Sequence, residues 1–329
     1  MRRSNFALIT GGILVVALVL VSMTFGSVTI SPLILFDGMQ NTGEGKDPMR
    51  ILLLELRLPR ALLALSVGAG LGVVGCFLQT VTRNDLADPF LFGLSSGAAA
   101  GAVAVISFCG DMLGVWTLPI ASFTGAMIAA FTLLFLIKKM EDQSPERLVL
   151  AGLAVSFVFT AVTNFLIFAG DQRAAHSVLF WSLGGLGLAR WDNIFLGISG
   201  ALLVVIYGQI NHRSLDALLT GEETAGSLGI NTKNFRVKIF LISAIATALF
   251  VSLVGVIGFI GLMVPHIARW LTGPLHRGVI IMSAVIGGIL LLISDILARL
   301  ILIPQELPIG IVTTALGAVF VFSLLIRNR

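Results

Sequence analysis

The sequence is a succession of long apolar runs separated by short polar connections. The first run, at about 6–25, follows two arginines, and seven more lie at about 61–81, 92–109, 115–137, 148–169, 193–210, 279–298 and 308–326. Each run approaches the roughly 20 residues with which a helix crosses a bilayer core of about 30 Å. The pattern therefore predicts an all-α polytopic membrane protein.

An uncharged stretch between Lys238 and His266 is too long for one upright helix and too short for two complete ones. Its glycines and its proline mark where the helix can break: Gly255, Gly258, Gly261 and Pro265. We therefore expect a full helix at about 236–254 and a short one at about 257–271. The total is then about ten transmembrane helices in a single domain over residues 1–329.

Composition supports this assignment and disfavours the soluble classes. Hydrophobic residues make up 57% of the chain and charged residues 12%, whereas an ordinary globular protein carries about 25% charged residues. The run at 6–25 is longer than the roughly 7–15 apolar residues of a secretory signal and lacks an evident cleavage site, so we expect a retained span. Cys76 and Cys109 lie in apolar context and form neither a disulfide framework nor a metal site.

The basic residues predict the orientation of the spans. Ten spans place both termini on one side, and 14 of the 21 Lys and Arg residues then share that side. Because cytoplasmic loops are enriched in Lys and Arg, we expect both termini in the cytoplasm. The seven on the outer side are Lys46, Arg50, Arg57, Arg60, Arg173, Arg190 and Arg299. Such scattered charge forms no continuous basic face, so the net charge of +4 does not indicate a nucleic-acid partner.

Three polar connections are long enough to carry function. Two are expected outside, at about 26–60 and 170–192, and one inside, at about 211–235. Within the inner one, Thr220 and Glu223 have capping-box spacing, which predicts that a short helix starts there and gives Glu222 and Glu223 a structural role.

Two glycine patterns imitate enzyme motifs. Gly70, Gly72 and Gly75 match a dinucleotide fingerprint, but they lie within an apolar helix, which favours close helix packing. Gly93-Leu-Ser95-Ser-Gly97 matches a nucleophile elbow, and with Gly101 it also forms a small-residue face on a helix. An intramembrane serine hydrolase using Ser95 remains the alternative function from another class.

Polar groups within the spans are few. Asp295 and Arg299 are spaced i, i+4 near one end of a span, so we expect a mutual ion pair. An ion-coupled carrier, which would need buried ionisable groups along its path, stays a second alternative. A mildly polar stripe follows one face of the fifth span and either lines a pathway or bonds back to its own helix: Ser156, Thr160, Thr163 and Asn164.

Ordered segments along nearly the whole chain resemble a known family, the FecCD-like permeases of type II ABC importers for iron–siderophore complexes, haem and cobalamin. The segments are Arg57-Leu-Pro-Arg60, Gly68 to Gln79, Arg83 to Pro89, Gly93 to Gly97, Leu218 to Ile230, Gly255 to Arg269, His276-Arg277, Asp295 to Arg299 and Glu306 to Gly310. The resemblance implies the type II ABC importer permease fold of ten helices in the bacterial inner membrane.

The resemblance also implies partners. Two permease copies, identical or paralogous, would enclose the pathway, two cytoplasmic ATPases would dock below, and a solute-binding protein would dock from the periplasm. The chain has no Gly-x4-Gly-Lys-Ser/Thr phosphate loop, so ATP and Mg would bind the partner ATPase and this chain would hold no cofactor or metal. The expected cargo is an iron–siderophore complex, with haem, cobalamin and a molybdate-type oxyanion also open.

Three sets of site residues are implied by the same resemblance. The segment 214–230 would be the coupling segment that contacts the ATPase, through Leu218, Leu219, Gly221, Glu222, Ala225, Leu228 and Gly229; a solvated amphipathic loop is the other reading. The docking arginines for the binding protein would be Arg57, Arg60 and Arg299, unless they anchor lipid headgroups or only pair internally. Gates would lie at the outer mouth with Trp181, Gly184 and Gly185, and at the inner connection with Asp142 and Ser144.

Overall fold

The computed structural model describes residues 2–26, 48–110, 113–141, 144–170 and 174–327. Eight helical stretches are long and apolar enough to cross a membrane. In chain order the elements are α1 (Arg2–Thr24), α3 (Pro48–Ile51), η1 (Leu52–Arg57), α4 (Leu58–Thr82), η2 (Pro89–Phe92), α5 (Leu94–Ala104), η3 (Val105–Cys109), η4 (Gly114–Trp116), α6 (Thr117–Lys139), α7 (Pro145–Ala169), α8 (Ala174–Ser182), α9 (Trp191–Thr220), α10 (Glu222–Ser227), α11 (Thr232–Val254), α12 (Ile260–Thr272), α13 (His276–Leu300) and α14 (Ile309–Arg327).

Two shorter helices add to these eight, which agrees with the predicted set of about ten. One is α5 with its continuation η3, and the other is α12. As the glycines predicted, α11 ends at Val254 and α12 starts at Ile260. Gly255 has φ +70°, and an added Cβ would lie only 2.4 Å from the carbonyl oxygen of Trp181, so only glycine fits this break.

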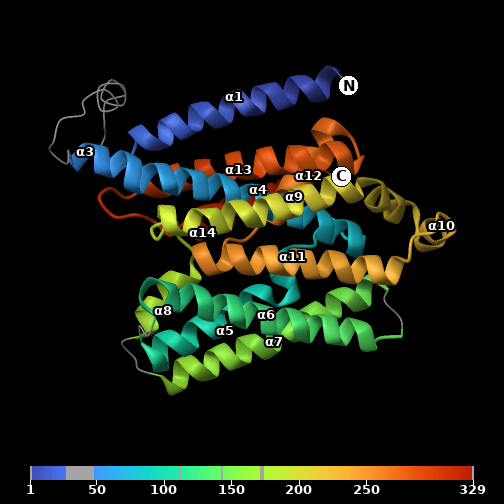
Figure 1. The fold of residues 1–329 in the computed structure, drawn as a ribbon, viewed down its shortest axis with the longest axis horizontal. Helices are drawn as coiled ribbons and strands as arrows, with labels where there is room; N and C mark the ends of the chain where they lie inside the picture. The colour runs from blue at the N-terminus through green and yellow to red at the C-terminus, as the bar shows by residue number, and fades with distance from the viewer. Residues whose placement is uncertain (1, 27–47, 111–112, 142–143, 171–173, 328–329) are drawn as a thin grey trace.

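The helices lie roughly along the long axis of the molecule, with α1, α4, α9, α12 and α13 on one side of α11 and α5, α6 and α7 on the other (Figure 1). Both termini lie toward the end that carries α10, whereas α3 and α8 lie at the opposite end (Figure 1). We call these the α10 end and the α8 end. An even number of crossings, as predicted, brings the termini to the same end.

The centre of the fold is α4, which packs against α13 over its length. Its glycines allow the contact, because a Cβ at Gly68 would meet the carbonyl of Gly287 and one at Gly72 would lie 2.7 Å from the carbonyl oxygen of Ser283. Gly75 likewise faces the backbone of Gly261 in α12. The helix-packing interpretation of the first glycine pattern is confirmed.

Several sequence expectations are corrected. Within the outer connection expected at 26–60, residues 48–57 are helical and lead directly into α4. The helix predicted at 193–210 extends to Thr220, since 211–220 contain neither proline nor glycine. The second glycine pattern is divided: Gly97 and Gly101 pack on α6, but Gly93 caps α5 with φ +80° and contacts Val155 of α7.

Candidate functional site

At the α8 end, the three predicted docking arginines lie together around a small cavity of about 170 Å³, with Glu306 beside them. Arg60 joins two carboxylates: its Nε lies 2.8 Å from Asp295 Oδ1 and its Nη1 lies 2.8 Å from Glu306 Oε2. The predicted Asp295–Arg299 ion pair is confirmed at 2.8 Å. These five side chains, which we call the arginine cluster, carry three positive and two negative charges.

Two of these arginines also hold the end of α1. Arg57 Nη1 donates to the carbonyl oxygens of Met23 and Thr24 at 2.6 and 3.1 Å. Arg299 donates from Nη1 to the carbonyl oxygen of Phe25 at 2.9 Å and from Nη2 to the hydroxyl of Ser22 at 2.7 Å. The last carbonyls of a helix have no partner within it, and cations there also offset its dipole. Internal pairing is therefore part of what these arginines do.

At the α10 end, the coupling segment is helical almost throughout. α9 ends at Thr220, Gly221 turns the chain with φ +123°, and α10 follows at once. Glu222 Oε1 accepts a 2.6 Å ion-paired hydrogen bond from Arg236 Nη2 of α11. The predicted capping box is wrong: Thr220 ends α9, and its hydroxyl donates back to the carbonyl oxygen of Ala217 at 2.8 Å.

The apolar side chains of this segment divide into two groups. Leu218 and Ala225 are buried against the bundle, whereas Leu219 is 46% exposed and Leu228 is 67% exposed. Gly229, with φ +82°, reverses the chain after Leu228. Two large apolar side chains are thus exposed at the α10 end of the molecule, one in the last turn of α9 and one directly after α10.

The predicted outer mouth is fastened to its neighbours by backbone hydrogen bonds. Gly184 N–H donates to the carbonyl oxygen of Trp181 at 3.1 Å, and Gly185 N–H donates to that of Val254 at 2.8 Å. The carbonyl of Gly184 accepts from Ile309 N–H at 3.1 Å. Since Val254 ends α11 and Ile309 starts α14, this turn connects three elements.

The polar stripe lies on a partly exposed face of α7. Thr163 bonds back to its own helix, donating to the carbonyl oxygen of Phe159 at 2.8 Å, while Ser156 donates at 3.4 Å to that of Leu91. Thr160 and Asn164 are exposed. At the inner connection, Asp142 lies outside the described residues, and Ser144 precedes Pro145 at the start of α7.

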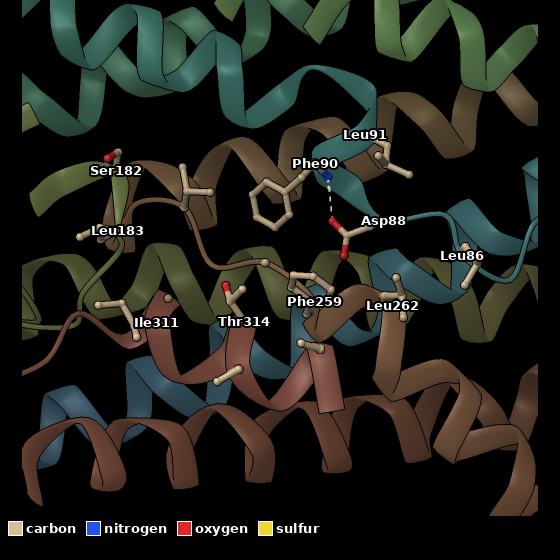
Figure 2. Close-up of a pocket in the computed structure, with 15 residues that line it drawn as sticks. Leu86, Asp88, Phe90, Leu91, Ser182, Leu183, Phe259, Leu262, Ile311 and Thr314 are labelled. Carbon is tan, nitrogen blue, oxygen red and sulfur yellow. Dashed lines mark hydrogen bonds between the residues drawn. The ribbon is translucent and has the colours of Figure 1, made fainter. Parts of the chain in front are cut away.

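A larger cavity, of about 790 Å³, lies elsewhere and was not predicted. It is lined mainly by apolar residues from the 86–91 turn, the 256–262 break and α14, and it reaches Ser182 and Leu183 after α8 (Figure 2). Phe90 points into it, and the carboxylate of Asp88 lies at its wall (Figure 2).

Asp88 is the one acidic residue among those that line this cavity. Its Oδ1 accepts from Phe90 N–H at 2.9 Å, whereas its buried Oδ2 has no hydrogen-bond partner among the described residues. Burial raises the pKa of this carboxyl from 3.8 to about 6, although the backbone N–H groups of Phe90 and Leu262 act in the opposite direction. Oδ2 lies beside Gly261 in the first turn of α12, where a helix end favours negative charge.

Among the described side chains, no hydrogen bond joins Ser95 to a histidine that could act as its base. The histidine that has a carboxylate partner, His276, contacts Thr80 and not Ser95, and both His276 and Thr80 are 1% exposed. Neither side chain can reach a substrate from that position.

The sequence matches the FecCD transport family over residues 14–327. The chain belongs to this family. It is 37% identical over 320 residues to the hemin transport system permease protein HmuU of Yersinia pestis, covering 96% of this chain and 94% of that protein. It is 33% identical over 321 residues to the iron(3+)-hydroxamate import system permease protein FhuG of Bacillus subtilis (strain 168), with 96% and 95% covered.

Structural comparison agrees with the family assignment. A solved structure of a metal-chelate type ABC transporter in an inward-facing conformation superposes with a TM-score of 0.84 at 27% identity, covering 98% of this chain and 99% of that one. Members of the FecCD family such as these relatives are membrane permeases, that is, transport components and not enzymes. This FecCD permease is accordingly a multi-span transport subunit with the type II ABC permease fold.

Sequence reasoning found the three arginines and Asp295 of the arginine cluster but missed other residues. Glu306 and His276 lie in segments that resemble the family, yet nothing in their spacing showed their partners. Asp88 precedes a proline in another such segment, which is the one signal that could have marked it. Asp216, the partner of His276, gave no signal at all.

Proposed function

We propose that this FecCD permease forms, with a second copy, the translocation pathway of a binding-protein-dependent ABC importer for a metal chelate. The observation that carries the proposal is the placement of two partner-facing features at opposite ends of one bundle. The arginine cluster lies at the α8 end, and α10, flanked by the exposed Leu219 at the end of α9 and Leu228 directly after α10, lies at the α10 end (Figure 1). An importer that obtains energy from one partner and cargo from another needs a contact surface for each partner, on opposite sides of the membrane.

The α10 end fits a protein partner that hydrolyses ATP. Leu219 and Leu228 offer apolar contact surface, and the ion pair of Glu222 with the buried Arg236 fixes α10 to α11. Short packed helices of this kind can transmit a rigid movement of a partner to the bundle. Two ATPase subunits in the cytoplasm would supply the energy, with ATP and Mg bound to them, and this chain would bind no cofactor. The membrane is then the bacterial inner membrane, with both termini in the cytoplasm.

The α8 end fits an acidic partner from the periplasm. The arginine cluster has one more positive than negative charge, and a guanidinium fork can hold a carboxylate through two parallel bonds. Arg60 is the best placed of the three, because its exposed partner Glu306 (42%) can move aside for a carboxylate of the solute-binding protein. Arg57 and Arg299 would mainly hold α1 and orient Arg60 by repulsion.

The large cavity supports a pathway beside α14. Its wall is apolar, with few polar groups and no cluster of metal ligands among the described residues. Such a wall suits passage of a bulky chelate without tight binding. We favour an iron–siderophore complex as cargo, and haem, cobalamin and a molybdate-type oxyanion are the other candidates that an uptake assay must include.

Uptake measured in cells that lack their own importer would test the proposal. The permease is expressed with a candidate ATPase and binding protein, and labelled ferric siderophore, haem, cobalamin and molybdate are supplied in turn. We expect uptake of one cargo that stops when the ATPase cannot hydrolyse ATP. Uptake that continues without the ATPase would support an ion-coupled carrier instead.

Two surface variants separate the partner sites. Arg60→Glu should weaken binding of the solute-binding protein while the ATPase still co-purifies, and Leu228→Asp should do the reverse. Unchanged affinity of the Arg60→Glu permease for the binding protein at low salt would refute the docking role.

A further inference from the structure

A buried chain of hydrogen bonds joins the end of α9 to α13 and α4. Asp216 Oδ1 accepts from the backbone N–H of His276 at 2.8 Å and lies 2.7 Å from its ring Nδ1. The other ring nitrogen, Nε2, lies 2.7 Å from the hydroxyl of Thr80. Because an ionised carboxylate can only accept, Nδ1 carries a proton. We call this chain the Asp216–His276–Thr80 link.

The link sits where each of its helices begins or ends. Asp216 lies in the last turns of α9, His276 is the first residue of α13, and Thr80 lies in the last turn of α4. The carboxylate thus also satisfies an N–H group that the first turn of α13 leaves unpaired. His276 and Thr80 are each 1% exposed, so water cannot replace the bond between them, whereas the Asp216 side chain is 25% exposed.

Helices α4 and α13 are also joined at their opposite ends. Near the α8 end, Arg60 of α4 and Asp295 of α13 form the 2.8 Å ion pair within the arginine cluster. Between the two joints the helices touch through their backbones, as at Gly68 and Gly287. The 20 residues from Arg60 to Thr80 span about 30 Å of helix. The pair α4–α13 is therefore a stiff unit that reaches from the arginine cluster to the coupling segment.

We infer that the Asp216–His276–Thr80 link couples the position of the coupling segment to the position of the arginine cluster. This inference rests on the proposed function. Docking at the arginine cluster shifts the α4–α13 unit, and the link passes that shift to the end of α9 and so to α10. His276 is a positioning residue in this scheme, since it contacts neither cargo nor nucleotide.

His276→Phe cuts the link without leaving a buried polar group unpaired. Asp216 still accepts from the backbone N–H of residue 276, and the Thr80 hydroxyl, no longer paired with Nε2, can donate to the carbonyl oxygen of Cys76, 2.8 Å away. Thr80→Val is a milder second variant that removes the contact with α4 alone. The matched control is Gln209→Ala, which removes a different α9–α13 bond, from Gln209 Nε2 to the carbonyl oxygen of Arg277 at 3.1 Å.

The experiment uses the complete importer in liposomes and compares ATP hydrolysis with and without the solute-binding protein. We expect His276→Phe to reduce the stimulation by the binding protein roughly 2- to 30-fold, while the ATPase still co-purifies and the binding protein still binds. Thr80→Val should reduce it less, and Gln209→Ala should retain the wild-type stimulation.

The outcomes separate the inference from the proposed function. Wild-type stimulation in His276→Phe and in Thr80→Val would overturn the link as a coupling joint. A reduction as large in Gln209→Ala would also overturn it, because any α9–α13 contact would then suffice. If the wild-type complex itself shows no stimulation, the proposed function fails instead.

Discussion

The buried carboxyl of Asp88 makes the stability of the protein depend on pH in a direction that the structure predicts. Its pKa is raised from 3.8 to about 6 by burial, so the folded state holds the proton more tightly than the unfolded chain does. The free energy of unfolding therefore falls as the pH rises from about 3.8 to about 6 and is level above that range. At about 1.36 kcal/mol per pKa unit, the full effect is about 3 kcal/mol.

The part of this effect that a convenient experiment can reach is smaller. Calculated from the same two pKa values, the free energy of unfolding falls by about 1.4 kcal/mol between about pH 5 and about pH 7.5. A change of about 1 kcal/mol moves the midpoint of thermal unfolding by about 2 °C in a protein larger than 150 residues. We therefore expect the midpoint of the detergent-solubilised protein to fall by about 3 °C over this range through Asp88 alone.

Asp88→Asn tests the origin of this pH dependence. The amide oxygen can still accept from Phe90 N–H, but the side chain no longer titrates. The difference in midpoint between the two pH values should thus shrink by about 3 °C in the variant. Asp85→Asn, which removes an exposed carboxylate (73%) from the same connection, should retain the wild-type difference. Equal pH dependence in wild type and Asp88→Asn would refute the burial argument.

Three further predictions concern stability and chemistry. Asp295→Ala, which leaves two arginines beside an empty buried site, should lower the free energy of unfolding by about 3–5 kcal/mol, and adding Arg299→Met should restore part of it, as measured by thermal unfolding. Gly75→Leu should prevent stable folding because its side chain would meet the backbone of α12, whereas Gly12→Ala, with nothing within 4 Å, should express normally in the membrane fraction. Ser95→Ala should retain cargo uptake, and its loss would revive the serine-enzyme alternative.

The apolar pattern determined most of the architecture. A run of about 20 apolar residues is stable in a bilayer as a helix, because a helix pairs the backbone groups of the segment internally. Most of the spans could therefore be placed within a few residues. The break between α11 and α12 was predictable for a similar reason, because glycine and proline act on the backbone locally. Errors arose in the polar connections, where residues 48–57 and 211–220 are helical although both were assigned to connections between spans.

The candidate sites were predictable only in part. A spacing of i, i+4 shows a contact within one helix, so the Asp295–Arg299 pair could be predicted. Arg60 reaches the same carboxylate across 235 positions of the chain, and no local pattern encodes that distance. The same holds for Glu306 and for the partners of His276. For the polar stripe on α7, the spacing showed that its residues share one face of the helix, but it did not show what that face contacts.

The sequence by itself determined that this chain is a multi-span helical membrane protein and where its basic residues fall along it, because membrane insertion is governed by the local run of apolar residues and the charges that flank it. The tertiary structure alone decided that Asp88 lies at a cavity wall, that two arginines hold the end of α1, and that Asp216, His276 and Thr80 form a link. Contacts between distant segments depend on how helices pack, and packing follows from the shapes of whole surfaces and not from any single segment.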